Sequence, residues 1–576
     1  MELDSYACYK EVLKGKNMIR KTALLLLISG PLFSVAYTWT GVPSSSWSNP
    51  SNWTPSGVPL TAADSALFSA SSRTTVFVDV FPTVGLLGFD NTSYTFNGNP
   101  IIVQQGSTTP NGPFPYAFSN VGGVASTQVF STQISLANNV TIIFGTQNII
   151  FNAAITGAGL SLNVASGVIT SAGINTYTGG TILGPSFAKP ASFILTGTGV
   201  MASTGSVSFT SGDVGDVLTF DIVGMNAASQ TIADLSSNLA AGGTATVNLA
   251  GKTLVVGTGN STTYGGAITG SAGNLTKQNA GTLNLTGTST YTGTTSISGS
   301  GGIAMKTGGV LSTSSGLSLT GTSFFDISQI TAGSFTLGNL NGVSGTFLWL
   351  GNKTFTFGTG SSANFSGTIQ NGGLGTGTGA SLVKVGAGAQ TLGGTNAFTG
   401  TTTITGGTIS IAAAGALSSS SSISIGASGT LEGAGLFTLA VPIGLAAGST
   451  VSVTAGNTMT LSGALTGVGG SLRKTNPGIL TLTNAGNTYS AGTTITGGTI
   501  SIGTAAPISS GAISIGAAGI LQGTGTFTLA NLISLGAGST VDVTGANALT
   551  LSAVVSGAGG SLTKVSSGTL TLSNTG

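Results

Sequence analysis

Residues 470–502 read GSLRKTNPGILTLTNAGNTYSAGTTITGGTISI, and this stretch decides the fold class. Its short runs alternate aliphatic residues with serine or threonine, as in Ile500-Ser501-Ile502, so each run has one apolar and one polar face. Glycine-containing turns separate such runs every 8–12 residues. No helical stretch of the kind that βαβ units require lies between them. The pattern predicts an all-β protein.

The same sequence motif recurs with a period of about 90 residues. SLVKVGAGAQTL begins at Ser381, SLRKTNPGILTL at Ser471 and SLTKVSSGTLTL at Ser561. A more diverged copy begins at Asn274 and a faint one at Leu160. Self-similarity at a fixed period indicates a repeat architecture, in which each unit packs on its neighbours.

Two architectures fit these short strands: a parallel β-helix, and an array of antiparallel sandwiches or barrels. A 90-residue unit would make about four coils of 20–25 residues, each rising about 4.8 Å. Stacked coils bring like charges within the Debye length of roughly 8 Å, and only 5% of the residues are charged. The low charge therefore favours the parallel β-helix, and we expect this β-helix to be right-handed.

A lysine recurs once in each late copy, at Lys384, Lys474 and Lys564. Four coils would separate neighbouring lysines by about 19 Å, beyond the range of strong repulsion. Lys474 shares strand parity with Leu472, so a straight strand would turn it inward. We expect the strand to end or bulge there, so that the ammonium group reaches solvent.

Composition excludes several classes of function. The formal charge of +2 comes wholly from the first 36 residues, which hold five basic and three acidic residues, and the rest holds ten of each. A neutral surface does not attract phosphate backbones, so nucleic acid is not an expected partner. The chain has no histidine, and Cys8 in the leader is its single cysteine. Ser-His-Asp catalysis and zinc–thiolate sites are therefore excluded.

Residues 18–36 have the pattern of a secretory signal peptide. Basic residues at Arg20 and Lys21 precede an apolar stretch, and small residues precede a cleavage site predicted after Ala36. The alternative is an uncleaved anchor, but Ser29, Gly30 and Pro31 interrupt the stretch before it reaches the 18–20 residues of a spanning helix. Translation could begin at Met1 or at Met18.

After the leader, residues 1–36, the chain divides into residues 37–150, diverged repeats over 151–380 and 90-residue repeats over 381–576. The first part carries Trp39, Trp47 and Trp53 within fifteen residues. A solenoid exposes sheet edge and apolar core at its first coil, so these residues predict an N-terminal cap. The alternative is an aromatic platform on which a glycan stacks.

Acidic residues offer few candidates for chemistry. The one local cluster is SGDVGDVLTFD, with Asp213, Asp216 and Asp221. Asp216 and Asp221 differ by an odd number of positions and would face opposite sides of one strand. Asp213 and Asp216 with loop carbonyls are weak candidate ligands for calcium, and a solvated loop is the expected interpretation. We therefore predict no catalytic residue, no cofactor and a non-enzymatic protein.

The late copies share the pattern G-x-L-x-K-x-x-x-G-x-L-x-L, then Tyr or Phe before x-G-x-T-x-I, then G-G-T-I-x-I. In the copy quoted first, this pattern covers Gly470 to Leu482, Tyr489 to Ile495 and Gly497 to Ile502. It resembles the autotransporter-associated β-strand repeat, also called the passenger-associated transport repeat. The resemblance implies a β-helical passenger of a Gram-negative type V secretion system, displayed at the cell surface or shed.

The resemblance also implies an outer-membrane β-barrel translocator as partner, and we find no such barrel in this chain, which stops within a repeat. We therefore expect a truncated gene product or a separately encoded barrel. The predicted role is structural or adhesive, through contacts with glycans or with host or neighbouring cell surfaces. Two alternatives stay open: a β-helical carbohydrate-active enzyme with paired carboxylates, and a non-functional remnant of a larger gene.

Overall fold

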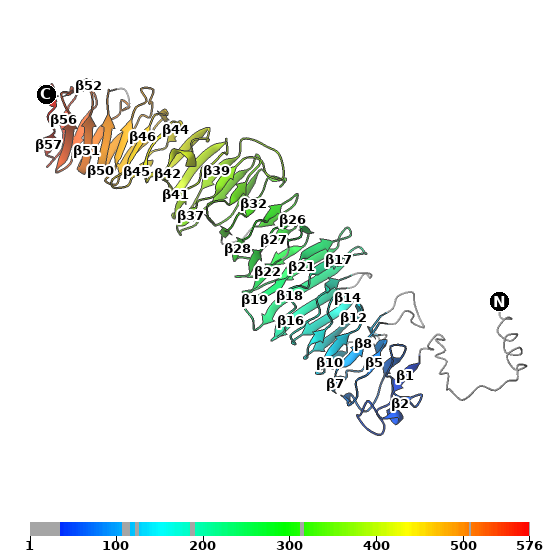
Figure 1. Ribbon diagram of the computed structural model, residues 1–576. Helices are drawn as coiled ribbons and strands as arrows, with labels where there is room; N and C mark the ends of the chain where they lie inside the picture. The colour runs from blue at the N-terminus through cyan, green and yellow to red at the C-terminus, as the bar shows by residue number, and fades with distance from the viewer. Residues whose placement is uncertain are drawn as a thin grey trace, which may run out of the picture.

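The structure is a computed structural model that describes residues 35–105, 116–120, 126–184, 190–257, 259–311, 316–505 and 508–574. These residues form a long rod, with the N-terminal coils at one end and the C-terminal coils at the other (Figure 1). The rod is a parallel β-solenoid of about 23 turns. The predicted signal peptide lies almost wholly outside the described residues.

Strands of successive coils pair in parallel along the rod. Two sheets dominate, with 17 and 26 strands among the described residues. Within those residues, the one antiparallel pairing joins β1 (Ala36–Trp39) to β2 (Trp53–Thr54) at the N-terminal end. The parallel pairing confirms the solenoid and excludes the sandwich array, whose strands would alternate in direction.

The 90-residue period corresponds to about four coils, as predicted. Lys474 is four register steps from Gln390, which lies six residues after Lys384, so successive lysines lie on neighbouring faces of the rod. Four parallel pairings lead from the strand of Lys474 to the strand of Lys564. Four more lead from the strand of Lys384 to that of Lys474. The strands of the first series are β48 (Ser471–Thr475), β50 (Gly492–Ile502), β51 (Ile513–Gly523), β54 (Ser539–Val543) and β57 (Leu562–Val565).

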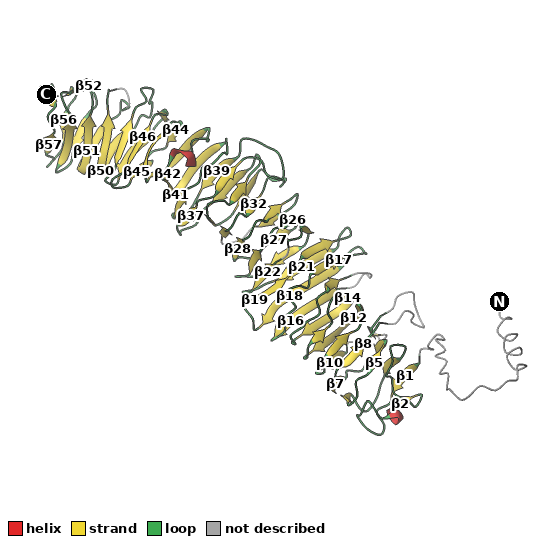
Figure 2. Cartoon of the chain, in the orientation of Figure 1, coloured by secondary structure: helices red, strands yellow, loops and turns green. Residues whose placement is uncertain are grey.

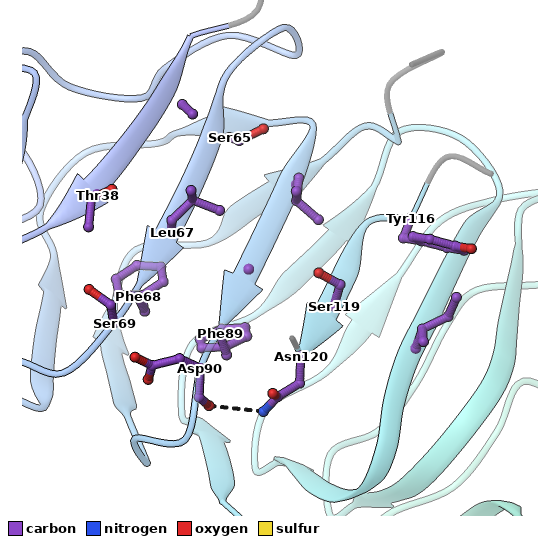
Figure 3. A pocket seen from close by; sticks show the side chains of 14 residues that line it. Thr38, Ser65, Leu67, Phe68, Ser69, Phe89, Asp90, Tyr116, Ser119 and Asn120 are labelled. Carbon is purple, nitrogen blue, oxygen red and sulfur yellow. Dashed lines mark hydrogen bonds between the residues drawn. The ribbon is translucent and has the colours of Figure 1, made fainter. Parts of the chain in front are cut away.

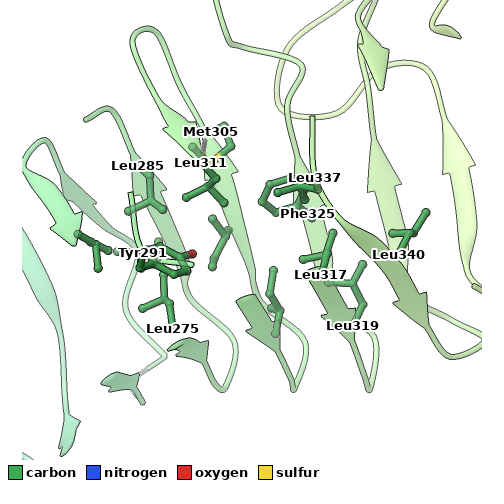
Figure 4. Close-up of a cluster of buried hydrophobic side chains, with 14 of the residues drawn as sticks. Leu275, Leu285, Tyr291, Met305, Leu311, Leu317, Leu319, Phe325, Leu337 and Leu340 are labelled. Atoms are coloured by element: carbon green, nitrogen blue, oxygen red, sulfur yellow. The ribbon is translucent and has the colours of Figure 1, made fainter. Parts of the chain in front are cut away.

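The core is a set of columns in which one residue lies above its partner in the previous coil. Leu275, Thr295, Leu317 and Leu340 are successive register partners and are all buried. Figure 4 shows side chains of this region gathered inside the coils, with Tyr291 between Leu275 and Leu285. Burial of these columns, at roughly 25 cal/mol per Å² of apolar surface, is the main stabilising term.

The Gly-Gly of the repeat forms a corner between two faces of a coil. Strand β50 shifts register between Ile495 and Gly497, and Gly498 has a φ of 67°. A side chain at Gly498 would place its Cβ 2.3 Å from the backbone oxygen of Asn476 in the previous coil. Only glycine combines a left-handed backbone with so close an approach.

The aromatic position of the repeat carries a buried hydrogen bond to the threonine four residues later. The hydroxyl groups of the three tyrosine–threonine pairs are 2.6–2.7 Å apart: Tyr177–Thr181, Tyr291–Thr295 and Tyr489–Thr493. In the copy that has Phe398 instead, the Thr402 hydroxyl pairs with the Ser420 hydroxyl at 2.8 Å. Each buried threonine thus finds a partner, as buried polar groups must.

Helical structure is confined to two single turns of 3-10 helix among the described residues, η1 (Pro50–Asn52) and η2 (Ala414–Ala416) (Figure 2). Within the same residues, no helix is long and apolar enough to cross a membrane.

Candidate functional site

The three tryptophans of the N-terminal region lie inside the cap. Trp39, Trp47 and Trp53 are 1%, 0% and 2% exposed. Trp53 makes edge contacts with both of the other indoles, with ring centroids 5.0 Å apart in each case. Each indole N–H donates to a backbone oxygen, of Arg73, Pro59 and Trp47 respectively. The cluster closes the first coil, and these rings present no face on which a glycan could stack.

A polar network holds the cap against the first coils. The Asp79 carboxylate accepts hydrogen bonds from the Ser48 N–H at 2.8 Å, from the Ser48 hydroxyl at 2.6 Å and from the Ser46 hydroxyl. Burial alone would raise the pKa of Asp79, but these hydrogen bonds outweigh it and lower the pKa below its usual value. The carboxylate is thus held ionised as an acceptor for the cap loop.

The predicted cleavage position lies at the first described strand. Ala36 is exposed and begins β1, where it is the register partner of Ser65. The backbone N–H of Ser65 donates to the oxygen of Val35 at 2.9 Å. Removal of the chain through Ala36 would leave the rest of β1 paired, and cleavage there stays a prediction.

The structure brings Asp213 and Asp216 together only through the backbone. The N–H of exposed Asp213 donates to Oδ2 of Asp216 at 3.4 Å, and Oδ1 of buried Asp216 has no partner among the described residues. Asp221 lies on β18 (Val217–Met225) and accepts from Asn248 instead. Nowhere in the described ranges do three His, Cys, Asp or Glu side chains gather as metal ligands. Calcium binding at this pair stays a weak prediction.

The environment of the repeated lysine differs from the one that we expected from the sequence. Lys474 is the last residue but one of β48, which ends at Thr475, and the lysine is 0% exposed. Its ammonium donates to the backbone oxygens of Thr475 at 2.7 Å, Asn476 at 2.6 Å and Gly497 at 3.2 Å. The prediction that this ammonium reaches solvent was wrong, because backbone oxygens at the corner replace water as its acceptors.

Lys384 has the same environment in the preceding repeat. It is 1% exposed, and its ammonium donates to the oxygens of Val385, Gly386 and Gly406. In both copies the farthest acceptor is the first glycine of the Gly-Gly corner in the following coil. Burial lowers the pKa of Lys384, and it lowers that of Lys474 to about 8. The lysine and the Gly-Gly therefore form one structural unit across two coils.

A groove lies on the outer face of the first coils and encloses about 570 Å³ (Figure 3). Its floor follows one outward column of register partners, Thr38, Leu67, Gly88, Ser119 and Ile143. Because Gly88 has no side chain, Leu67 lies across it: a Cβ there would be 2.6 Å from Leu67 Cδ2. The floor is therefore more apolar than the Ser/Thr columns farther along the rod.

Polar groups at the groove serve the fold. The Asp90 carboxylate accepts from the N–H groups of Ala70 at 2.9 Å and Thr92 at 3.0 Å, and Asn120 donates to the Asp90 backbone oxygen at 3.0 Å (Figure 3). Burial raises the pKa of Tyr116 on the groove wall. Asp90 is the one carboxylate among the described lining residues, whereas glycoside hydrolysis uses two. The groove can hold an apolar group, and it lacks an acid–base pair.

Acidic residues of the C-terminal half lie in outward columns. Glu432 accepts from Ser410 at 3.0 Å, Ser452 at 3.1 Å and Asn476 at 3.3 Å. The next acidic residue along the chain, Asp542, lies five strand pairings away, or about 24 Å. These two carboxylates are too far apart to act on one glycosidic bond.

Sequence reasoning did not single out one aromatic group on the outer face. Phe324 on β32 (Phe324–Asp326) and Trp349 on β35 (Phe347–Trp349) stack with ring centroids 4.3 Å apart, and Phe347 lies 6.1 Å from Trp349. All three side chains are partly exposed. Two signals were available: adjacent phenylalanines at 324 and 325 must face opposite sides of a strand, and Phe347 and Trp349 share a parity.

The comparisons with known proteins match the segments that carry the buried lysines and the Gly-containing corners described above. The model of the passenger-associated transport repeat family matches residues 275–301, 382–411 and 472–502. Each match contains a buried lysine of the repeat: Lys277, Lys384 and Lys474 respectively. Each also contains the Tyr or Phe position and a positive-φ glycine. The matched motif is thus the lysine, the aromatic residue and the corner.

One curated relative is the "Adhesin BmaC autotransporter" of Brucella suis biovar 1 (strain 1330). It is 33% identical over 165 residues, which are 28% of this chain and 4% of that protein. The matched part therefore spans a small fraction of the relative's length. No solved structure matches the chain significantly.

The strand register, the buried lysines and the Gly-Gly corners together define a parallel β-solenoid that is built from repeats. Three segments of the chain match the model of the passenger-associated transport repeat, which confirms the recognition of that repeat from its motifs.

Proposed function

We propose that this protein is an exported passenger of the autotransporter type, displayed at the cell surface or secreted, with a structural or adhesive role. The observation that carries the proposal is the set of three passenger-associated transport repeats within one solenoid. The name of the relative, an adhesin autotransporter, supports the adhesive part. Residues 18–36 would direct the chain across the inner membrane of a Gram-negative cell.

A rod suits adhesion for a physical reason. Outward positions carry serine, threonine and asparagine in columns, and such groups make many weak, uncharged contacts. Display of many copies then raises avidity without a tight single site. The expected partners are glycans and host or neighbouring cell surfaces, together with an outer-membrane β-barrel translocator that carries the passenger outward.

The proposed role is non-enzymatic. The supporting observations are the absence of histidine from the sequence, the single carboxylate that lines the described groove and the separation of Glu432 from Asp542. Each removes one element of the acid–base machinery that a glycosidase or lyase would need.

Deletion of the gene tests the proposal. We expect the deletion strain to adhere less to epithelial monolayers or abiotic surfaces, and expression in trans to restore adhesion. Protease shaving of intact cells should release fragments of the passenger. Unchanged adhesion together with resistance to shaving would contradict the proposal. N-terminal sequencing of the released protein tests cleavage after Ala36.

A further inference from the structure

We infer that Phe324, Phe347 and Trp349 form a contact site for a neutral, β-linked oligosaccharide on the outer face of the rod. This inference rests on the proposed adhesive role and names the chemical class of its ligand.

The three residues occupy adjacent rungs of the sheet that contains β32 and β35. Phe324 is the register partner of Phe347, and Trp349 is the partner of Asp326. Phe324 and Trp349 are therefore diagonal neighbours, and their planes lie 19° from parallel. The inward neighbours Phe325 and Leu348 are fully buried. The three outward rings, called the aromatic platform below, therefore lie outside the core.

Two segments border the rings. The loop at Gly373 borders Trp349, since a Cβ at Gly373 would lie 2.9 Å from Trp349 Cβ, and a glycine lies beneath Phe324. Gly302 precedes Phe324 in its column, and a Cβ at Gly302 would lie 2.5 Å from the Phe324 ring. The phenyl ring thus lies flat over a glycine backbone. In the next rung the column continues with Thr368 and Gln370. The platform is therefore flat on one side and bordered by hydroxyl and amide groups on the other.

These columns present no exposed charge among the described residues. Asp326 is the one charged residue in these columns across the four rungs from Gly302 to Gln370. It is buried, and its carboxylate accepts from the N–H groups of Ser328 and Leu374, both at 2.7 Å. No free charge on these columns would recognise an ionic ligand, so the matching ligand is uncharged.

A pyranose with equatorial hydroxyl groups fits this surface. Its C–H face is apolar and packs on aromatic rings, while its rim hydroxyls need polar partners such as those of Thr368 and Gln370. A β-1,4-linked chain is extended and can follow successive rungs along the rod.

Calorimetric titration of the purified chain with cellohexaose and with chitohexaose tests the inference. We expect saturable binding of at least one of them. Trp349→Thr and Phe347→Thr should weaken it at least tenfold, because threonine is the common outward residue of this rod and preserves the strand. Trp349→Phe should keep part of the affinity. Phe77→Thr is the matched control, since Phe77 is 51% exposed on β4 (Thr75–Val78) and its loss should leave binding unchanged.

Absence of saturable binding with either oligosaccharide would overturn the inference, and so would binding that Trp349→Thr leaves intact while hydrogen exchange shows an unchanged fold. Adhesion of the deletion strain distinguishes failure of this inference from failure of the proposed function. If deletion of the gene reduces adhesion but no oligosaccharide binds, the site is wrong and the adhesive role stands. If Trp349-dependent binding is found but deletion leaves adhesion unchanged, the adhesive role is wrong and the site stands.

Discussion

Two copies of the repeat motif have different environments in the same molecule. They are residues 470–502 and residues 560–574. In the first copy Lys474 is 0% and Leu482 1% exposed. In the second, Lys564 is exposed and Leu572 is 52% exposed. The Lys564 ammonium still donates to the oxygens of Val565 and Ser566, as Lys474 does to those of Thr475 and Asn476.

The difference is the third acceptor. Lys474 reaches the oxygen of Gly497 in the following coil, and no described coil follows Lys564. The local sequence therefore supplies two acceptors, and the next coil supplies the third acceptor and the cover. Burial of the repeated lysine is a property of two stacked coils, as expected where each repeat is stabilised by its neighbours.

The largest expected effect is that of Gly498→Ala, which disturbs the corner that covers Lys474. The new Cβ would meet the Asn476 oxygen at 2.3 Å, so we expect a loss of at least about 3 kcal/mol of unfolding free energy. Gly545→Ala is the control, because Gly545 has a φ of 57° but no atom within 4 Å of the added Cβ. It should lose about 1 kcal/mol. Equal losses in denaturant titrations would contradict the close approach.

Stability should rise with pH because of Lys474. Its folded pKa of about 8 lies below the ordinary 10.5, so the unfolded chain binds more protons between these values and unfolding becomes less favourable as pH increases. The rise from pH 8 to 9.5 is at most about 2 kcal/mol. Above pH 10 the buried tyrosines, whose pKa values are raised, oppose it. Thermal melts of wild type and Lys474→Met between pH 7 and 9.5 measure the difference, and parallel curves would contradict this prediction.

Lys474→Met should destabilise the folded state by about 1–2 kcal/mol at pH 7, because three backbone oxygens lose their donor. Lys564→Met, the matched change in the other copy, should have an effect within about 0.5 kcal/mol. Hydrogen exchange followed by mass spectrometry can locate the loss in the coils of β48 and β50. Similar effects of the two substitutions would show that the following coil does not matter.

The smallest expected effect is that of Tyr489→Phe, about 1 kcal/mol, because the Thr493 hydroxyl loses its buried partner. Adding Thr493→Val should recover part of this loss, since neither group is then unsatisfied. The double-mutant cycle in denaturant titrations gives the coupling between the two hydroxyls. A coupling near zero would contradict a structural role for the pair.

Strand content, the four-coil period and the N-terminal cap could be predicted from the sequence, because each follows from local alternation or from repetition. The environment of Lys474 could not be predicted from the sequence, because its third acceptor, the oxygen of Gly497, belongs to the next coil. The same limit applies to the outer face. The Trp39, Trp47 and Trp53 cluster was the more visible signal. The partly exposed rings lie around Trp349 instead, where the register of β32 with β35 decides which rings meet.

By itself, the sequence determined the kind of rod: alternating aliphatic and hydroxyl residues with a 90-residue repeat leave few other ways to bury an apolar face. Tertiary structure alone decided which repeated residues are buried, which rings meet on the outer face and where a cation can lie inside the rod. The physical reason is that a residue in a parallel coil contacts residues about twenty positions away in the next coil. The environment of a side chain is therefore set by stacking as well as by its adjacent residues.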